Sequence, residues 1–270
     1  MSYVDAFYDK NKDIVKVVER VDGKRIFVDH RPEYNFYVAD PKGSHTSVYG
    51  EKVTEIRCKS LKEFRKNVSI NTHNKKYESD IRPVNKTIAK HYLGADQPVL
   101  QTAFLDIEVD FDPDRGYSSP EDAFMEITSI GVYLQWMKAM VCLAVPPKTL
   151  SWGQATAIAD KMPEVVLCKT EKEMLQTFLE LIDDADILSG WNSEGYDIPY
   201  LVNRITKVLG KAETRKLCLF DQFPKQRTFE AYGSERETYD LVGRVHLDYM
   251  QLYRKYMYEE RHSYRLDYIG

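Results

Sequence analysis

Short apolar runs separated by turn residues fill the first forty positions of the chain. The pair Asp22-Gly23 favours a hairpin turn, and it joins two strand candidates, Val15 to Val21 and Lys24 to Val28. A third strand candidate runs from Tyr34 to Ala39. The capping-box pattern Ser60-x-x-Glu63 then predicts a short helix. The front of the chain is therefore expected to be rich in strands.

The pattern changes after residue 100, where strands and helices alternate. Three strand candidates come first, at Val99–Val109, Glu126–Leu134 and Met140–Val145. A second capping box, Thr170-x-x-Glu173, predicts an amphipathic helix that ends at about Asp184. A short apolar strand at Ile187–Trp191 precedes another amphipathic helix, which ends at Gly210. Three strands followed by helix, strand and helix indicate a mixed α/β layout.

The remaining segments complete the expected organisation. A hairpin is predicted around Tyr232-Gly233-Ser234, then a strand at Val245–Leu247 and a helix from Tyr249. The stretch 69–99 is polar and irregular, and it ends near Pro98. We place a domain boundary there, with a strand-rich N-terminal domain at 1–98 and an α/β domain at 99–270.

Composition limits the class of protein. Of the 270 residues 43% are hydrophobic, enough for a core, and the mean hydropathy is −0.49. The longest apolar run, Ala139 to Val145, is far shorter than the roughly 18 residues that a membrane span needs. The first thirty residues are charged throughout, and the four Cys form no Cys-x-x-Cys pair. We therefore expect a cytoplasmic protein without a membrane partner, a zinc knuckle or a disulfide framework.

The net charge of −4 is unevenly distributed. Residues 1–100 contain 19 Lys and Arg against 14 Asp and Glu, and residues 101–270 contain 19 against 28. Within 52–90 the counts are 11 and 4. Such a basic segment could contact nucleic-acid phosphates, although a solvated charged surface is the commoner explanation. The acidic second part suggests metal binding instead.

The segment Phe104-Leu105-Asp106-Ile107-Glu108-Val109-Asp110 is the most informative one. Side chains alternate on a strand, so the three acids share one face and the aliphatic residues share the other. Carboxylates two positions apart on a strand can jointly bind a hard divalent cation. Composition alone gives about 1.6 Asp-x-Glu pairs by chance, so the apolar alternation around them is what makes the segment suggestive. A strand with an acidic solvated face is the alternative.

A second segment, Gly190 to Tyr200, connects a predicted strand to a predicted helix. Loops that follow strands often carry ligands and catalytic groups. Asp197 falls at the start of the helix, with Pro199 in its first turn. Taken alone, Asp197 is most simply interpreted as an N-cap.

The two segments together resemble B-family DNA polymerases. Phe104-Leu105-Asp106-Ile107-Glu108 is similar to the first exonuclease motif of that family, and Asn192-x-x-x-Tyr196-Asp197 is similar to the second. The second segment is especially close to the polymerases of T-even-type phages. The similarity extends through Leu247-Asp248-Tyr249 to Ser263-Tyr264-x-Leu266-Asp267-Tyr268-Ile269, and thus covers about residues 100–270.

The resemblance implies a 3′→5′ proofreading exonuclease on an RNase H-like fold. It implies two divalent ions, Mg²⁺ or Mn²⁺, with Asp106 bridging both, Glu108 binding one and Asp197 the other. Single-stranded DNA and primer-template 3′ ends would be the partners. The resemblance also makes Asn192 and Tyr196 candidates for substrate binding. Two aromatic residues after the first motif, Phe111 and Tyr117, could stack on a terminal base or simply pack.

The chain departs from the family pattern at its end. The family's fourth carboxylate lies in a Tyr-x-x-x-Asp motif, and only Tyr92-x-x-x-Asp96 fits here, before the first motif and therefore rejected. We expect an exonuclease domain truncated before its third motif, with the remaining polymerase polypeptide as a partner. Two alternatives stay open: a catalytically silent DNA-binding or assembly module of a split polymerase, and an unrelated RNase H-like nuclease that acts on RNA.

Overall fold

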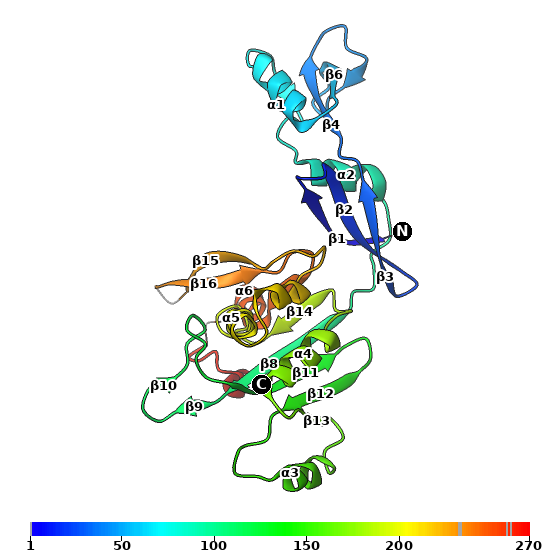
Figure 1. Ribbon diagram of the computed structural model, residues 1–270. Coiled ribbons are helices and arrows are strands. Elements are labelled where there is room, and N and C mark those ends of the chain that lie inside the picture. Colours follow the sequence, from blue (N-terminus) through cyan, green and yellow to red (C-terminus); the bar gives the residue numbers. More distant parts are fainter. Residues whose placement is uncertain (1, 232–233, 258, 260) are drawn as a thin grey trace. The chain divides into compact units, whose positions relative to one another are not determined.

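The computed structural model describes residues 2–231, 234–257, 259 and 261–270, and the chain divides into two compact units, Met1–Pro98 and Val99–Gly270 (Figure 1). Among the described residues no helix has the length and apolar character needed to cross a membrane.

The first unit begins with a three-stranded antiparallel sheet in the order β1 (Ser2–Asp9), β2 (Ile14–Val21), β3 (Lys24–His30). Asp22 and Gly23 have φ values of 50° and 76°, the left-handed conformation that a two-residue hairpin turn requires. The predicted hairpin is therefore confirmed. The helix α2 (Pro83–Tyr92) packs on this sheet, where its Tyr92 meets the buried side chains of Val15 and Val17.

A second sheet of this unit has four strands in the order β5 (His45–Thr46), β6 (Lys52–Cys58), β4 (Tyr34–Ala39), β7 (Lys76–Tyr77). The helix α1 (Leu61–Ile70) packs against β4 and β6. Its N-cap is Ser60, whose hydroxyl accepts the N–H of Glu63 at 3.2 Å, as predicted. The Phe64 ring lies edge-on to Phe36, with centroids 5.6 Å apart.

The second unit is built on a six-stranded mixed sheet in the order β13-β12-β11-β8-β14-β17. The central strand β8 is antiparallel to β11 and parallel to β14. The strands are β8 (Thr102–Val109), β11 (Ile127–Leu134), β12 (Ala139–Ala144), β13 (Val165–Leu167), β14 (Ile187–Gly190) and β17 (Val245–Asp248). This arrangement confirms the mixed α/β class.

Helices bury one face of this sheet (Figure 1). Leu105 and Ile107 of β8 enter the core together with Phe178 of α4 (Glu171–Leu181) and Ile198 of α5 (Asp197–Val208). Thr170 caps α4 by accepting the N–H of Glu173. The helix ends at Leu181, about three residues before the predicted end at Asp184. The other helices are α3 (Trp152–Ala159), the 3₁₀ helix η1 (Lys211–Leu217), α6 (Tyr249–Tyr256) and α7 (Leu266–Ile269).

Two hairpins project from the second unit. One is very short, pairing β9 (Phe111–Asp112) with β10 (Gly116–Tyr117). The other pairs β15 (Lys225–Ala231) with β16 (Ser234–Asp240) where the sequence predicted a hairpin. Residues 232 and 233 of its expected turn lie outside the described residues.

Candidate active site

The strand β8 presents two carboxylates on the sheet face opposite to the helical core. Leu105 and Ile107 are buried at 4% and 6% exposure, whereas Asp106 and Glu108 between and beyond them point outward. On the neighbouring strand β11, Gly131 pairs with Asp106 and Ser129 pairs with Glu108. These small partners leave space beside the carboxylates.

The space is a groove of about 510 Å³ that both carboxylates line. Its other walls are mainly apolar and come from β8, β11, β12, the end of β14 and the C-terminal helices; they include Phe104, Tyr133, Met140, Trp191 and Leu266. Phe104 and Tyr133 lie across from one another, with ring centroids 6.4 Å apart. The groove therefore combines acidic oxygens at one place with broad apolar walls.

Asp197 reaches the same strand from α5. The pairing of β14 with β8 stops at Phe104, so the later N–H groups on that edge of β8 have no strand partner from β14. Asp197 Oδ1 accepts one of them, the N–H of Ile107, at 3.1 Å. The helix begins at Asp197 itself, with Tyr196 as the N-cap residue. The N-cap interpretation of Asp197 is therefore wrong: its side chain turns to the strand between Asp106 and Glu108.

Burial and like charge raise the pKa of this group. Asp197 is 3% exposed, and burial followed by the charge of Asp106 raises its pKa from 3.8 to about 7, although the N–H of Ile107 partly offsets this. Burial also raises the pKa of Asp106. Acids whose ionisation is disfavoured by burial and by a neighbouring acid are often found at functional sites, and a nearby cation would favour their charged form.

The loop from Gly190 to Tyr196 is tightly held. A Cβ on Gly190 would lie 2.6 Å from the carbonyl oxygen of Leu105, so only glycine lets β14 end this close to β8. Asn192 adopts a left-handed φ of 58°, and its carbonyl accepts the N–H groups of Gly195 and Tyr196 at 3.0 and 3.1 Å. The backbone of Asn192 thus stabilises the turn that precedes Asp197.

The aromatic candidates have different surroundings. Tyr196 stacks on Tyr200 with centroids 5.5 Å apart, and burial together with the charges of Tyr200, Asp197 and Glu108 raises its pKa to about 12. Its hydroxyl therefore stays protonated, and it donates to the carbonyl of Ser118 at 3.4 Å. Phe111 and Tyr117 face each other across β9 and β10, with centroids 4.9 Å apart and exposures of 47% and 85%. They form an exposed aromatic pair on the hairpin that follows β8.

The donor set fits a hard divalent ion, although its side chains are not gathered around one point. Among the described residues no group of three His, Cys, Asp or Glu side chains is arranged to hold a metal ion. Asp106 is nevertheless close enough for its charge to raise the pKa of Asp197, and every candidate ligand is a carboxylate oxygen, the type that Mg²⁺ and Mn²⁺ prefer. Carboxylates repel one another, and a cation would draw them together.

The sequence analysis missed the side-chain contacts that the loop from Gly190 to Tyr196 makes with the larger hairpin and with β17. Arg227 of β15 forms ion pairs with Glu194 in the loop and with Asp240 of β16. Ser193 Oγ lies 2.9 Å from His246 Nε2 of β17, and burial lowers the pKa of His246 to about 4. No spacing rule indicates such contacts, because the partners are 33 and 53 residues apart.

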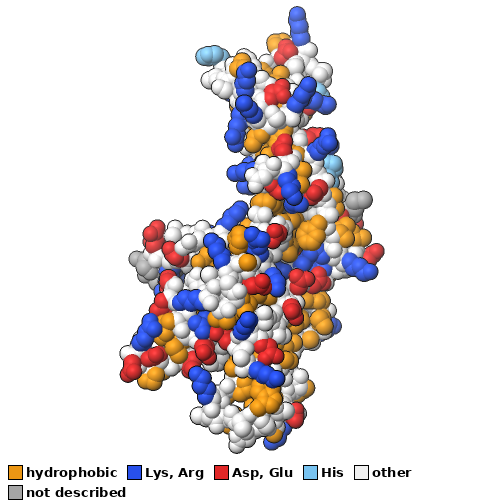
Figure 2. All heavy atoms as spheres, viewed as in Figure 1, with side chains coloured by type: hydrophobic (Ala, Val, Ile, Leu, Met, Phe, Trp, Pro, Cys, Tyr) orange, Lys and Arg blue, Asp and Glu red, His pale blue; other side chains and the backbone are white. Residues whose placement is uncertain are grey.

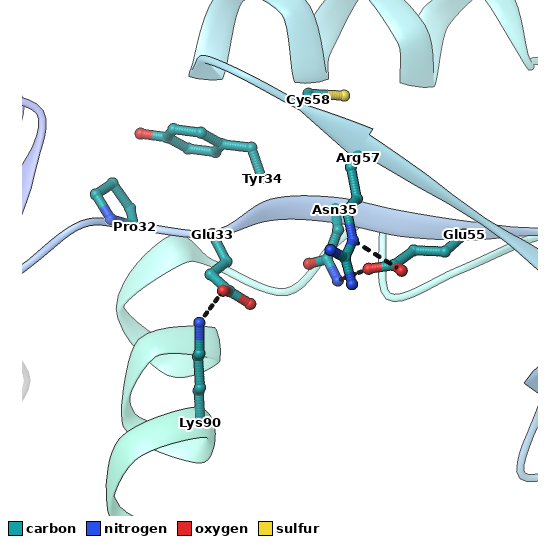
Figure 3. A pocket seen from close by; sticks show the side chains of 8 residues that line it. All are labelled: Pro32, Glu33, Tyr34, Asn35, Glu55, Arg57, Cys58 and Lys90. Carbon is teal, nitrogen blue, oxygen red and sulfur yellow. Dashed lines mark hydrogen bonds and ion pairs between the residues drawn. The ribbon is translucent and has the colours of Figure 1, made fainter.

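The first unit offers a contrast to this site. One of its pockets, shown in Figure 3, is lined by charged groups that neutralise each other: Lys90 pairs with Glu33, and Arg57 with Glu55. Over the visible surface, Lys and Arg side chains alternate with Asp and Glu (Figure 2). In this pocket the basic residues Arg57 and Lys90 are each paired with an acid.

The strand β8 thus has two outward carboxylates, and α5 brings a third carboxylate to the same strand. Residues 47–269 match the family DNA polymerase family B, exonuclease domain, and the chain belongs to this family. The expected resemblance is therefore confirmed, and with it the assignment to a polymerase exonuclease region.

Two relatives make the similarity more specific. The DNA-directed DNA polymerase of Escherichia phage RB69 is 35% identical to the chain over 120 residues, and that of Enterobacteria phage T4 is 29% identical over 120 residues. Each match covers 41% of this chain and 13% of the relative. The chain thus spans only a small part of the length of the phage polymerases that it matches.

Proposed function

We propose that residues 99–270 form the 3′→5′ proofreading exonuclease region of a phage-type family B DNA polymerase, and that residues 1–98 are a separate N-terminal domain. The reaction is hydrolysis of the 3′-terminal phosphodiester of single-stranded DNA with two divalent ions, Mg²⁺ or Mn²⁺. One observation carries the proposal: the buried carboxylate of Asp197 accepts the N–H of Ile107 on β8, between the outward carboxylates of Asp106 and Glu108.

Asp106, Glu108 and Asp197 are the groups that hold the ions. When bound, such ions lower the pKa of a water molecule and stabilise the charge on the leaving oxygen and the phosphate. The protein's own contribution is to fix the ligands: β8 sets Asp106 and Glu108 on one face, and the N–H of Ile107 orients Asp197. The pKa of Asp197 near 7 makes ion binding increase with pH, since protons and cations compete for the same oxygens.

Four further residues contact the DNA strand in this proposal. Phe111 and Tyr117 provide exposed rings on which an unpaired base stacks. Tyr196 keeps its hydroxyl proton and acts as a hydrogen-bond donor beside the carboxylates, and the Asn192 amide can pair with the strand. Only a single strand offers unstacked bases to such rings, so frayed primer ends are the natural substrate.

The silent-module alternative is less well supported. It would leave without a role the two outward carboxylates of β8 and the buried Asp197 that is hydrogen-bonded to this strand, and membership of the exonuclease family does not favour it. The same membership disfavours an unrelated nuclease for RNA. The remaining polymerase polypeptide is the partner that the relatives' greater length suggests, and the cytoplasm of a phage host is the corresponding location.

A cleavage assay on single-stranded DNA tests the proposal. The chain is incubated with 5′-labelled DNA and Mn²⁺, beside Asp106→Ala and Asp110→Asn. Asp110 is an exposed acid just beyond β8, so its variant is a matched control. We expect a ladder that shortens from the 3′ end with the wild type and Asp110→Asn, and at least about 100-fold slower cleavage with Asp106→Ala. DNA binding without cleavage in the wild type would support the silent module instead.

A further inference from the structure

A buried acid on the edge strand, Asp248, makes contact with the loop that delivers Asp197. Asp248 is the last residue of β17 and lies opposite Gly190, the last residue of β14, in parallel register. The two strands therefore end side by side, one in the site loop and the other in α6. Asp248 is only 5% exposed, and its side chain lies where these two segments leave the sheet.

Both oxygens of Asp248 are used by backbone groups. Oδ1 accepts the N–H of Asn192 at 3.2 Å, and it caps α6 by accepting the N–H groups of Met250 and Gln251 at 2.9 and 3.3 Å. Oδ2 accepts the N–H of Glu194 at 3.0 Å. One carboxylate thus satisfies two donors of the site loop and two of a helix N-terminus.

The loop contacts go beyond what capping requires. An N-cap side chain needs to reach only its own helix, and Ser or Thr does this as well as Asp. The N–H groups of residues 192 and 194 converge because Asn192 has a left-handed φ, which forms a small concave array of donors suited to an anion. The carboxylate of Asp248 accepts hydrogen bonds from both N–H groups of this array.

The contacts of Asp248 with the loop also affect the placement of Asp197, one of the candidate metal ligands. Asn192 and Glu194 lie five and three residues before Asp197. The carbonyl of Asn192 accepts the N–H groups of Gly195 and Tyr196, and that of Ser193 accepts the N–H of Ile198 in the first turn of α5. The orientation of the first turn of α5, and with it the bond from Ile107 to Asp197, depends on this loop. Asp248 itself is not among the groove-lining residues, which include Asp106 and Glu108.

We propose that Asp248 is a positioning residue of the exonuclease site: by binding the N–H groups of Asn192 and Glu194, it holds the loop that places Asp197 for ion binding. This inference rests on the proposed function. Residues that orient metal ligands without touching the ion change metal affinity by about 10- to 100-fold when they are replaced.

The test is a Mn²⁺ titration of the whole chain by calorimetry. Asp248→Ser is the informative variant, because serine still caps α6 but is too short to reach both loop N–H groups. Thr170→Ala is the matched control, since it removes the N-cap of α4 in the same unit and leaves the loop intact. We expect the Mn²⁺ dissociation constant to rise about 10-fold or more in Asp248→Ser and to stay within twofold in Thr170→Ala.

Amide hydrogen exchange separates positioning from general destabilisation. We expect faster exchange at residues 190–197 in Asp248→Ser and unchanged exchange there in Thr170→Ala. A Mn²⁺ affinity within twofold of wild type in Asp248→Ser, or unchanged exchange in its loop, would overturn the inference. Failure of the proposed function looks different: the wild type and Asp106→Ala would then bind Mn²⁺ equally, whatever Asp248→Ser does.

Discussion

Two buried carboxylates of the second unit, Glu171 and Asp197, are 8% and 3% exposed and have opposite electrostatic surroundings. Glu171 receives a two-pronged bond from Arg204, with Nε–Oε1 and Nη2–Oε2 distances of 2.6 and 2.7 Å, and also accepts the N–H of Ile127. Its charge is therefore neutralised by a side chain of the same unit.

Asp197 has the opposite situation. Its bonds come from backbone N–H groups, and the charges that affect it are the negative ones of Asp106 and Asp248. Burial without a cation normally neutralises an acid by raising its pKa. The comparison teaches that the charge of Glu171 is compensated within the fold. The negative charge of Asp197 is not compensated in this way, so a proton or an external cation would stabilise this group.

The largest effect is expected when Glu171 is made to resemble Asp197. Arg204→Met leaves a buried carboxylate without its cation and should lower the free energy of unfolding by about 3–5 kcal/mol. Urea unfolding followed by tryptophan fluorescence measures this, because all three Trp lie after residue 99. The double variant Glu171→Gln, Arg204→Met should recover part of the loss, and a single variant within about 1 kcal/mol of wild type would contradict the comparison.

Removing the charge of Asp197 should instead increase the free energy of unfolding. The folded pKa near 7 exceeds the ordinary 3.8, so the folded chain favours the protonated acid and loses stability as pH rises between these values. In metal-free buffer Asp197→Asn should therefore stabilise the chain by up to about 4 kcal/mol at pH 8, and by less than half as much at pH 5. Urea unfolding at both values checks this; equal effects at pH 5 and 8 would show that charge is not the cause.

The smallest effect concerns the surface beside the acids. Replacing Phe111 and Tyr117 together by alanine should weaken binding of single-stranded DNA by about 1–3 kcal/mol per base unstacked, without changing stability appreciably. Fluorescence anisotropy with a labelled oligonucleotide measures it. Trp152→Ala, an exposed aromatic on α3, is the control. Equal affinity in the double variant and the wild type would mean that this pair only packs against itself.

The sequence alone predicted the helices and strands that have a recognisable local sequence pattern. Alternation placed Asp106 and Glu108 on one face of a strand, and capping boxes located the starts of α1 and α4. It missed α2, because the polar residues Lys86, Thr87 and Lys90 interrupt the apolar pattern of this helix. It also missed β13 and the two-residue strands β9 and β10, which are too short to show a period.

The sequence suggested the residues of the candidate site but not their contacts. Motif resemblance singled out Asp197, yet its bond to Ile107 joins residues 90 positions apart and has no local signature. The N-cap interpretation failed for this reason, since a free edge of β8 competes successfully for the side chain. The contacts of Asp248 likewise depend on strand order, which places β17 beside β14. The ion pair of Arg227 with Glu194 joins residues 33 positions apart and has no local signature either.

The central claim is that Asp106, Glu108 and Asp197 together attract an external cation, whereas Glu171 does not. Mn²⁺ binding measured by electron paramagnetic resonance at pH 7.5 tests it directly, with wild type, Asp106→Ala and the double variant Glu171→Gln, Arg204→Met. We predict that the double variant binds as the wild type does, and that Asp106→Ala binds at least about 10-fold more weakly. Equal binding by Asp106→Ala and wild type would contradict the account.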